Sequence, residues 1–565
     1  MPRKPMNKIL RKAKRILRRR LPLACFAAIL LALCATAGIY LSRSAIAEPL
    51  AQEPPVQNTD TQKDTVPLPL PMAGSGVTLS VGKQYYTFTL RTADASLSCG
   101  LPTQVGQTDR RALRTRSAYR FPVERDGVPA GAVTLTLDQS VDGTVFYVQS
   151  DAPAQDALYL DISTAQDDAL TVRPVSFGRS AAVDADAPTW DEPYPGSTAL
   201  YLEGDGVHLR LSRLCALRSL GQTVYTYRSP AAGAVLSQTD GGLRLSLPLT
   251  CKEGELLDAS GVLTETPGVN WEDGTARQNV GYLDAADTDY HIMADGVYIT
   301  MPEDYAPRDG DGRHIYRTAT AWLLGPCTYD SNGPMFAAIG KSIVYTYLDN
   351  VNEKGFLPTG PTSGWLQGDF GIGGGFYDTR FNFDTMKRLM RAETVWDDHE
   401  IGETVQRMLD FYCGFADRNQ FTFLGHPFVP DYGDAEGDSR GALSSLNHYL
   451  AEGLLLLRAG DAYANEGYTA RGWGVLDAID KTYYRWIRDN ADLWYGVYPD
   501  GWLRRGDYVE VTYLDLIDAA ALLDKYGRWE EYEGIQTLLH EKERWLRLAG
   551  RPELLEDHPA FTFAD

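Results

Sequence analysis

A change in hydrophobic period near residue 301 constrains the fold of this chain more than any other feature. From Val77 to about Met301, short runs such as VTLSV, YYTFTL and AVTLTLD alternate polar and apolar residues. Alternation of this kind indicates strands with one buried face, and regularly spaced short strands are typical of antiparallel sandwiches. From about Arg313, apolar residues recur every three or four positions, which indicates helices. We therefore predict an antiparallel β-sandwich region over residues 76–301, as one domain or two, and a helical domain over residues 313–550.

The loops between the predicted helices alternate in length. Short joins contain Gly460 and Gly527, which are natural helix stops, whereas long loops occupy residues 355–384, 415–441 and 493–510. In helical hairpins arranged as a toroid, such long loops gather at one end. We therefore predict an all-α (α/α) toroid whose three long loops line a central cleft.

The N-terminal residues resemble a membrane anchor. Residues 1–20 are strongly basic, and residues 21–41 contain no charged side chain. A run of this length can span a bilayer as a helix, and the positive charge before it predicts a cytoplasmic N-terminus. A cleaved signal peptide is the alternative, because Ala45 and Ala47 fit the small-x-small pattern. We predict a single-pass cell-membrane protein with a basic cytoplasmic segment (1–20), a transmembrane signal-anchor (21–41), a disordered linker (48–75) and an extracytoplasmic body.

The charge of the chain excludes one class of partner. Its formal net charge is −21, with 54 basic and 75 acidic residues. So acidic a protein is a poor ligand for nucleic acid, because phosphate binding requires clustered Lys and Arg. The seven cysteines are scattered and form no C-x-x-C pattern, which disfavours a zinc site. We predict no metal ion and no cofactor. A disulfide between Cys215 and Cys251 stays open.

The first long loop, residues 355–384, reads GFLPTGPTSGWLQGDFGIGGGFYDTRFNFD and has no regular period. Its glycines allow the backbone to lie close to a ligand. Aromatic rings beside carboxylates, an arginine and an amide form a set of side chains suited to sugars. We predict Asp369 and Asp378 as catalytic residues. The substrate-binding residues predicted here are Trp365, Tyr377, Arg380 and Asn382. The alternative is a well-packed structural loop.

The second long loop and the helix after it hold further candidates. A glycosidase needs two carboxyl groups that flank the scissile bond. Asp431 and Asp434, facing Asp369 or Asp378 across a cleft, could provide them, with Tyr432 binding the substrate. In the following helix, His448 and Glu452 are four residues apart and share a face, so His448 is a candidate general base, with Glu452 as its catalytic partner. Asn447 would bind hydroxyl groups. The alternatives are a solvated turn or a calcium-like loop for the acidic segment, and a structural pair for His448 and Glu452.

The third long loop combines aromatic rings with arginines. Tyr495 and Trp502 are candidates for stacking on sugar rings, and Tyr498 is a candidate acid or base. Arg504 and Arg505 could hold a uronate carboxylate, since a guanidinium pairs bidentately with that group. The alternative for the arginines is pairing with acidic neighbours in the same loop.

A β-sandwich followed by an (α/α) toroid resembles a group of polysaccharide-processing proteins that includes D-glucuronyl C5-epimerases, glycosidases and uronate lyases. The segments GFYDTRFNFDT, SSLNHYLAEGLLLL and VYPDGW are similar to landmarks of such helical domains. The resemblance implies a carbohydrate substrate and assigns no catalytic residue. We therefore predict a carbohydrate-active enzyme that acts on a polysaccharide or oligosaccharide by glycosidic hydrolysis or uronate C5 proton transfer. The alternative is a non-catalytic glycan-binding or cell-envelope assembly protein. The sugar, the bond, the stereochemistry and the oligomeric state stay open.

Overall fold

The structure is a computed structural model that describes residues 76–153, 157–165, 170–178, 186–240, 242–285, 290–310 and 312–557. These residues fall into two compact units. The β-rich unit holds the described residues from 76 to 418 together with 432–440. The helical unit holds residues 419–431 and 441–557.

Two antiparallel sheets make up most of the β-rich unit. The smaller sheet has six strands in the order β1 (Gly76–Val81), β2 (Gln84–Thr92), β8 (Leu158–Thr164), β16 (Gly242–Pro248), β15 (Ala232–Thr239) and β10 (Pro193–Pro195). The main path of the larger sheet is β18 (His291–Met293), β19 (Gly296–Thr300), β21 (Arg313–Arg317), β14 (Val224–Arg228), β13 (Cys215–Gly221), β17 (Leu256–Thr264), β7 (Thr144–Ser150), β6 (Val128–Gln139), β5 (Thr115–Arg125) and β3 (Leu97–Cys99). Four more strands extend it: β4 (Thr103–Arg110), β9 (Thr171–Ser176), β11 (Thr198–Gly204) and β12 (Val207–Leu211).

The core of this unit lies between the two sheets. Successive side chains of a strand point to opposite faces, so each strand contributes every second residue to the core. Strand β17 shows the pattern: Leu257 and Ala259 join the hydrophobic cluster shared by both sheets, whereas Asp258 between them faces the other way. The outer face of the larger sheet is therefore free to receive other elements and polar groups.

Helix α4 (Pro334–Asn350) covers part of that outer face and contacts β6, β7, β17 and β19. A buried polar network fastens it. Asp138 on β6 accepts two hydrogen bonds from Arg116 and one from Ser342 on α4, all at 2.6 Å. The Tyr147 hydroxyl lies 2.6 Å from the same serine. Because every charged member has a partner, the network can be buried without leaving an uncompensated charge.

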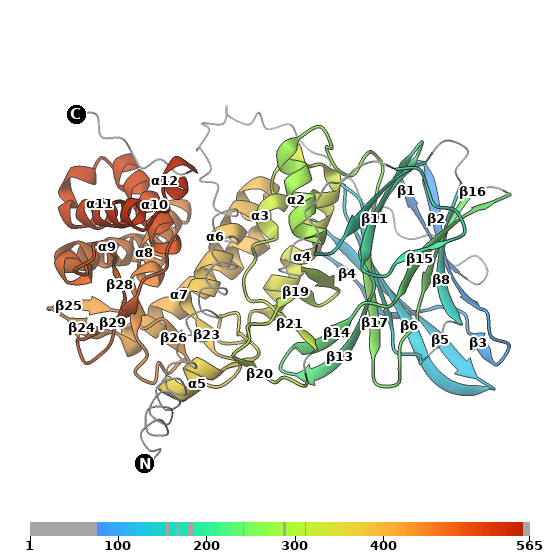
Figure 1. Ribbon diagram of the computed structural model, residues 1–565, viewed down its shortest axis with the longest axis horizontal. Coiled ribbons are helices and arrows are strands. Elements are labelled where there is room, and N and C mark those ends of the chain that lie inside the picture. The colour runs from blue at the N-terminus through green and yellow to red at the C-terminus, as the bar shows by residue number, and fades with distance from the viewer. Residues whose placement is uncertain are drawn as a thin grey trace, which may run out of the picture. The chain divides into compact units, whose positions relative to one another are not determined.

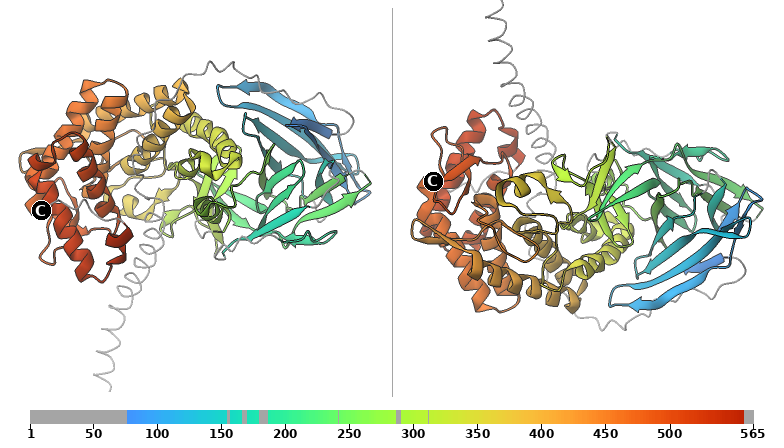
Figure 2. Two further views of the ribbon diagram at one scale, coloured as in Figure 1. Left: turned by 90° about the horizontal axis from the view of Figure 1, so that it is seen from above. Right: turned by 90° about the horizontal axis from the view of Figure 1, so that it is seen from below.

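The remaining helices of the β-rich unit are α2 (Gly274–Asp284), α3 (Leu324–Cys327), α5 (Gly364–Phe370), α6 (Thr379–Trp396) and α7 (His399–Asn419). Figures 1 and 2 show α2, α3 and α4 between the sheets and helices α6 and α7. Short strands join the loops of this part: β20 (Tyr305–Ala306) pairs with β22 (Thr362–Ser363), and β23 (Tyr377–Asp378) pairs with β26 (Tyr432–Gly433).

The helical unit contains α8 (Leu446–Ala462), α9 (Glu466–Trp486), α10 (Val511–Lys525), α11 (Glu533–Leu548) and α12 (Glu553–Asp557). Helices α8 and α11 each pack against both α9 and α10 (Figure 1). The short strands of the unit are β24 (Phe421–Phe423), β25 (His426–Phe428), β27 (Ser444–Ser445), β28 (Trp494–Val497) and β29 (Leu503–Gly506). Strands β27, β28 and β29 form one small sheet at the start of α8.

The predicted fold class, an antiparallel sandwich followed by an all-α toroid, is wrong. The architecture is mixed: helices α3, α4, α6 and α7 belong to the same compact unit as the sheets, and short strands interrupt the helical part of the chain. The physical reason is visible in α4, whose apolar residues are buried all round because one side lies on a sheet. Hydrophobic period indicates the type of an element but not the partner against which it packs.

The predicted membrane topology is also corrected. In the part of the chain that the structure describes, no helix has the length and the apolar character needed to cross a bilayer. The basic segment, the signal-anchor and the linker were all predicted within residues 1–75, which lie outside the described residues. We therefore withdraw the transmembrane helix, the signal-anchor, the membrane partner and the single-pass cell-membrane location with an extracytoplasmic body.

Candidate functional site

Asp378 lies where the first long loop enters helix α6. Strand β23, to which it belongs, pairs with β26 and fixes the backbone in an extended conformation. Asp378 is the N-cap residue of α6, and its carboxylate accepts a hydrogen bond from the Phe381 N–H at 2.9 Å. The residue is 4% exposed. Local sequence therefore places a carboxyl group inside the protein at the positive end of a helix.

The surroundings of Asp378 favour its protonated form. Burial is the main cause that raises the pKa of this carboxyl to about 7; the Phe381 N–H opposes the rise, and the charge of Asp384 contributes to it. Tyr316 on β21 is close enough to interact with the charge of Asp378. Burial, and secondly this charge, raise the pKa of the Tyr316 phenol. Arg380 is engaged with Asp384 at 3.1 Å. Near neutral pH, Asp378 is therefore divided between acid and carboxylate, as a group that donates and accepts protons must be.

Other residues predicted in the first loop have structural contacts. The Asn382 side chain accepts from the Leu357 N–H at 2.8 Å and donates to the carbonyls of Leu357 and Asp378. Tyr377 is buried among the rings of Phe356, Phe411 and Phe415. These two side chains hold the loop against α6 and α7.

Trp365 and Asp369 lie on α5, away from the interior. The Trp365 indole donates to Asp369 at 2.7 Å, and its ring packs edge-on against Tyr432 and Phe370. Asp369 is exposed, whereas Asp378 is buried.

Asp434 forms a turn of the second loop. Its carboxylate accepts from the backbone N–H groups of Glu436 and Asp438 and from Arg440 at 2.8 Å. Partial burial raises the pKa of Asp434, but hydrogen bonds from the Asp438 N–H and from Arg440 outweigh this effect and hold the pKa below its usual value. A carboxylate stabilised in this way is a poor proton donor at neutral pH.

A second cluster of buried polar groups surrounds the start of α8 in the helical unit. Its members are Asp431, Ser444, Ser445, Asn447, His448 and Glu452. Asp431 accepts from the Ser445 N–H at 2.8 Å, and the same oxygen lies 3.8 Å from Nδ1 of His448. Glu452 lies one turn further along α8. Burial of Tyr449 is the main cause that raises the pKa of its phenol, and the charge of Glu452 is the second. Asp431 was predicted from the second loop, and Asn447, His448 and Glu452 from the helix after it; in the structure all four are buried around the start of α8.

Two serines of this α8 cluster have unused hydroxyl groups. Ser445 stands at the N-cap position of α8, where a serine hydroxyl ordinarily accepts a backbone N–H, yet its side chain makes no capping bond. Within the described residues, the buried hydroxyls of Ser444 and Ser445 have no hydrogen-bond partner. Buried polar groups are nearly always paired, so two adjacent exceptions indicate a place where a polar ligand or water is held.

The hairpin β28–β29 presents a different surface. Trp502 at its tip is 68% exposed. Arg504 stacks over the Tyr498 ring at 4.3 Å and pairs with Asp500, and Arg505 is exposed. Tyr495 is instead buried and packs edge-on against Tyr508. The hairpin therefore offers exposed aromatic and cationic groups, whereas Tyr495 packs inside the protein.

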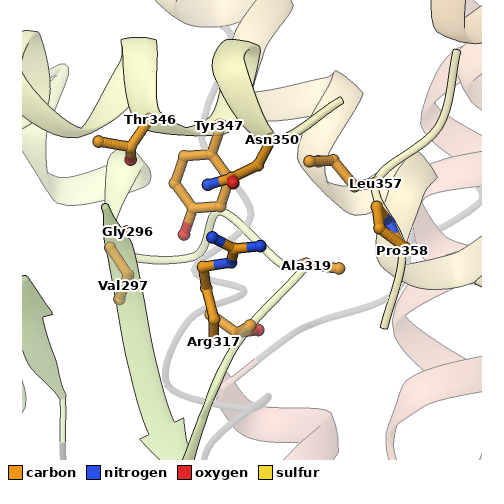
Figure 3. Close-up of a pocket in the computed structure, with 10 residues that line it drawn as sticks. Gly296, Val297, Arg317, Ala319, Thr346, Tyr347, Asn350, Leu357 and Pro358 are labelled. Atoms are coloured by element: carbon orange, nitrogen blue, oxygen red, sulfur yellow. The ribbon is translucent and has the colours of Figure 1, made fainter. Parts of the chain in front are cut away.

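A pocket in the β-rich unit lies apart from these residues. Figure 3 shows the Arg317 side chain reaching into it toward Tyr347 and Asn350. Arg317 lies 3.7 Å from Asp295, and Asn350 donates to the carbonyl of that aspartate at 3.0 Å. None of the residues predicted from the sequence lines this pocket.

Sequence reasoning missed three residues that the structure places at these clusters. Tyr316 lies in a strand more than sixty residues before Asp378, and no local pattern connects the two. Ser444 and Ser445 were part of the quoted motif SSLNHYLAEGLLLL. A serine pair directly before a helix is a recognisable N-cap signal, but its failure to cap can be seen only in the structure.

No group of three or more His, Cys, Asp or Glu side chains among the described residues could hold a metal ion. The five described cysteines are free thiols, so Cys215 and Cys251 form no disulfide.

Comparison with known proteins gives only distant matches. No family model matches the chain, and no curated protein matches it. Among solved structures, a cellobiose 2-epimerase from Bacillus thermoamylovorans has 13% identity over 48% of this chain and 70% of its own, with a TM-score of 0.36. A family 76 glycoside hydrolase from a bovine Bacteroides thetaiotaomicron strain has 9% identity over 71% and 85%, with a TM-score of 0.36. A bacterial glucoamylase complexed with acarbose has 11% identity over 84% and 62%, with a TM-score of 0.25. All three are carbohydrate-active enzymes, but such low TM-scores carry no argument about this chain.

Proposed function

We propose that this protein is a carbohydrate-active enzyme in which Asp378 transfers a proton to or from an oligosaccharide or polysaccharide. The observation that carries the proposal is the buried Asp378 carboxyl, whose pKa is raised to about 7. A general acid or base works best when its pKa lies near the working pH. Strongly perturbed carboxyl groups are typical of active sites, although structural networks also produce them.

Two reactions use such a group. In glycosidic hydrolysis, a protonated carboxyl donates to the leaving oxygen while a second carboxylate acts as base or nucleophile. In uronate epimerisation or elimination, the proton at C5 is removed by a base. Tyr316, beside Asp378, provides a phenol that can return a proton to the sugar. Hydrolysis uses the protonated form of this carboxyl and C5 proton abstraction uses its carboxylate form. An amide can serve as neither, so a single variant tests both reactions.

The α8 cluster supports a sugar as the ligand. Hydroxyl, amide, imidazole and carboxylate groups are gathered there, and the Ser444 and Ser445 hydroxyls have no partner among the described residues. Sugar hydroxyls both donate and accept hydrogen bonds, so they match such a mixed set. Asp431 already accepts the N–H at this helix end, which makes a neutral polyol a better ligand here than an anion.

The test is turnover by Asp378→Asn, measured by NMR in D₂O with neutral glucans and mannans and with uronate polysaccharides. We expect activity to fall by about 100-fold or more, the usual contribution of a general acid. Asparagine is as good an N-cap as aspartate and does not titrate, so the variant should stay folded and be at least as stable as the wild type at neutral pH. Asp410→Asn, on an exposed position of α7, serves as the control and should keep full activity. Undiminished turnover by a folded Asp378→Asn protein would refute the proposal.

A second candidate function, glycan binding without catalysis, is favoured by the exposed hairpin β28–β29. Trp502 and the stacked pair of Tyr498 and Arg504 form an aromatic, cationic surface in an otherwise acidic chain.

For this candidate we expect Trp502→Ala to weaken glycan binding about tenfold, the loss of one stacking contact worth roughly 1.4 kcal/mol. Tyr484→Ala removes another exposed aromatic ring, on α9, and should bind as the wild type does. Titration calorimetry against the same polysaccharides measures both affinities. Equal affinities of the two variants would exclude the hairpin as the binding surface.

A further inference from the structure

A row of polar side chains crosses the outer face of the larger sheet. Cys215 on β13 is the cross-strand neighbour of Asp258 on β17, and Asp258 is the neighbour of Gln149 on β7. Directly opposed residues of antiparallel strands project from the same face, so these three side chains lie side by side. Gln149 donates to one carboxylate oxygen of Asp258 at 2.9 Å.

His291 of strand β18 completes the row. Its Nε2 lies 2.8 Å from the other oxygen of Asp258, and the imidazole is close enough to the Cys215 sulfur for their charges to interact. Cys215, His291 and Asp258 are all buried, and apolar residues that include Met293 and Ile315 surround the thiol. A carboxylate that holds an imidazole beside a thiol is the arrangement that activates cysteine nucleophiles.

The charges of this group support one another. Burial acts against a charged thiolate, but His291 and then Arg213 overcome it and lower the pKa of Cys215. Burial likewise acts against a charged imidazole, but the Cys215 thiolate and Asp258 raise the pKa of His291 to about 10. Each charge thus favours the other, and transfer of the proton from sulfur to imidazole is favoured over loss of a proton from an isolated buried thiol.

Packing alone does not require this arrangement. Burying several charges is costly, and apolar residues of similar volume commonly serve stability as well or better. The other buried cysteines show the ordinary alternative. Cys251 and Cys327 donate their S–H groups to the carbonyls of Ala152 and Leu323 at 3.1 and 3.2 Å. Burial raises the pKa of Cys327, so it stays a thiol.

We propose that Cys215 is a modification site for small hydroperoxides, with His291 and Asp258 as its positioning residues. The thiolate sulfur attacks one peroxide oxygen, the O–O bond breaks, and an S–O bond forms. With hydrogen peroxide, the leaving hydroxide takes the proton of the His291 imidazolium and departs as water. The products are a cysteine sulfenic acid, a neutral imidazole and one water molecule, and sulfur has given two electrons to the peroxide.

The burial of Cys215 limits the size of the molecules that can react with its sulfur. Cys215 and Asp258 are buried, whereas Gln149 at the far end is half-buried and reaches the surface. We therefore expect a molecule about as large as water to reach the thiol from this end, and a bulky disulfide reagent to be excluded. Reaction with hydrogen peroxide and resistance to aromatic disulfides should therefore occur together in the folded protein.

The test compares cysteines within one wild-type chain. The full-length protein is treated with hydrogen peroxide at neutral pH, sulfenic acid is trapped with dimedone, and each cysteine is quantified by mass spectrometry. Cys327 is as deeply buried as Cys215 and lacks the imidazole, so it is the matched control. We expect Cys215 to be labelled about tenfold faster than Cys327 or more, since the thiolate is the reactive form.

Variants then test the positioning residues. His291→Gln and Asp258→Asn should slow labelling of Cys215 toward the rate of Cys327, and Cys327→Ser should leave it unchanged. A variant that unfolds is recognised because Cys327 and Cys251 become labelled as well, and the wild-type comparison then decides alone. Labelling of wild-type Cys215 no faster than Cys327 would overturn the proposal, as would fast labelling of Cys215 in a folded His291→Gln protein.

Discussion

At the scale of single residues, Asp378 shows burial prevailing over helix electrostatics. A carboxylate at an N-cap accepts backbone N–H groups and lies at the positive end of the helix, and both effects favour its charged form. In this chain the loss of hydration outweighs them, and Asp384 adds a repulsive charge. The result is an acid held in a position where sequence alone would predict a carboxylate.

This balance makes stability depend on pH. The pKa of Asp378 is about 7 in the folded state against 3.8 for the free group, so the folded protein binds the extra proton between these values. Its contribution is therefore complete below pH 4 and is lost as the pH rises through 7. Relative to Asp378→Asn, the free energy of unfolding of the wild type should fall by a few kcal/mol across this window. Urea denaturation of both proteins at several pH values measures it, and parallel curves would show that Asp378 titrates normally.

At the scale of elements, helices α8 and α9 begin in different ways. Asn465 caps α9 by accepting the N–H groups of Gly467 and Tyr468 at 2.9 and 3.3 Å. Ser445 occupies the same position of α8, and its buried hydroxyl makes no such bond. A helix without this capping bond leaves the serine hydroxyl able to bind another group. Such a loss of stabilising contacts is common where a ligand binds.

We therefore expect Asn465→Ala to destabilise the protein by about 1 kcal/mol, the usual value of a cap. Ser445→Ala should leave stability unchanged or raise it slightly, because it removes a buried hydroxyl without a partner. If the α8 cluster binds sugar, the same substitution should weaken binding. Denaturation and glycan titration of the two variants measure these effects. A loss of stability for Ser445→Ala as large as that for Asn465→Ala would show that its hydroxyl does cap α8.

The sequence was informative about elements and their local chemistry, and less so about their partners. Alternation located the strands because each sheet has one face in a shared core, and the i, i+4 spacing correctly placed His448 and Glu452 on α8. Tyr495 and Trp502 looked equivalent as loop aromatics, yet one is buried and the other exposed. Tyr495 packs against Tyr508 after the chain turns back, whereas Trp502 lies at the tip of the hairpin. Such contacts arise from tertiary packing, which local patterns do not record.

At the scale of the whole molecule, the grouping of elements into units could not be predicted, because it depends on which apolar face meets which. The change of period near residue 301 suggested a boundary there, but α4 lies on the larger sheet and joins the strands in one unit. Each unit also has its own buried ionic network. Asp138 and its partners fasten α4 in the β-rich unit, and Lys542 fastens α11 in the helical unit.

Lys542 provides a test of whether the two units unfold together. Its ammonium group is fully buried and lies 3.0 Å from Asp492, 2.7 Å from Asp507 and 2.6 Å from the Tyr508 carbonyl. Lys542→Met leaves two carboxylates without this partner, and breaking a buried pair costs roughly 3–5 kcal/mol. Because the network lies within the helical unit, we expect hydrogen exchange to accelerate in α8–α11 while β5–β7 and α4 keep their protection. Ser342→Ala, which loosens α4, should produce the reverse pattern. Equal loss of protection in both units, in either variant, would mean that the chain unfolds as one cooperative body.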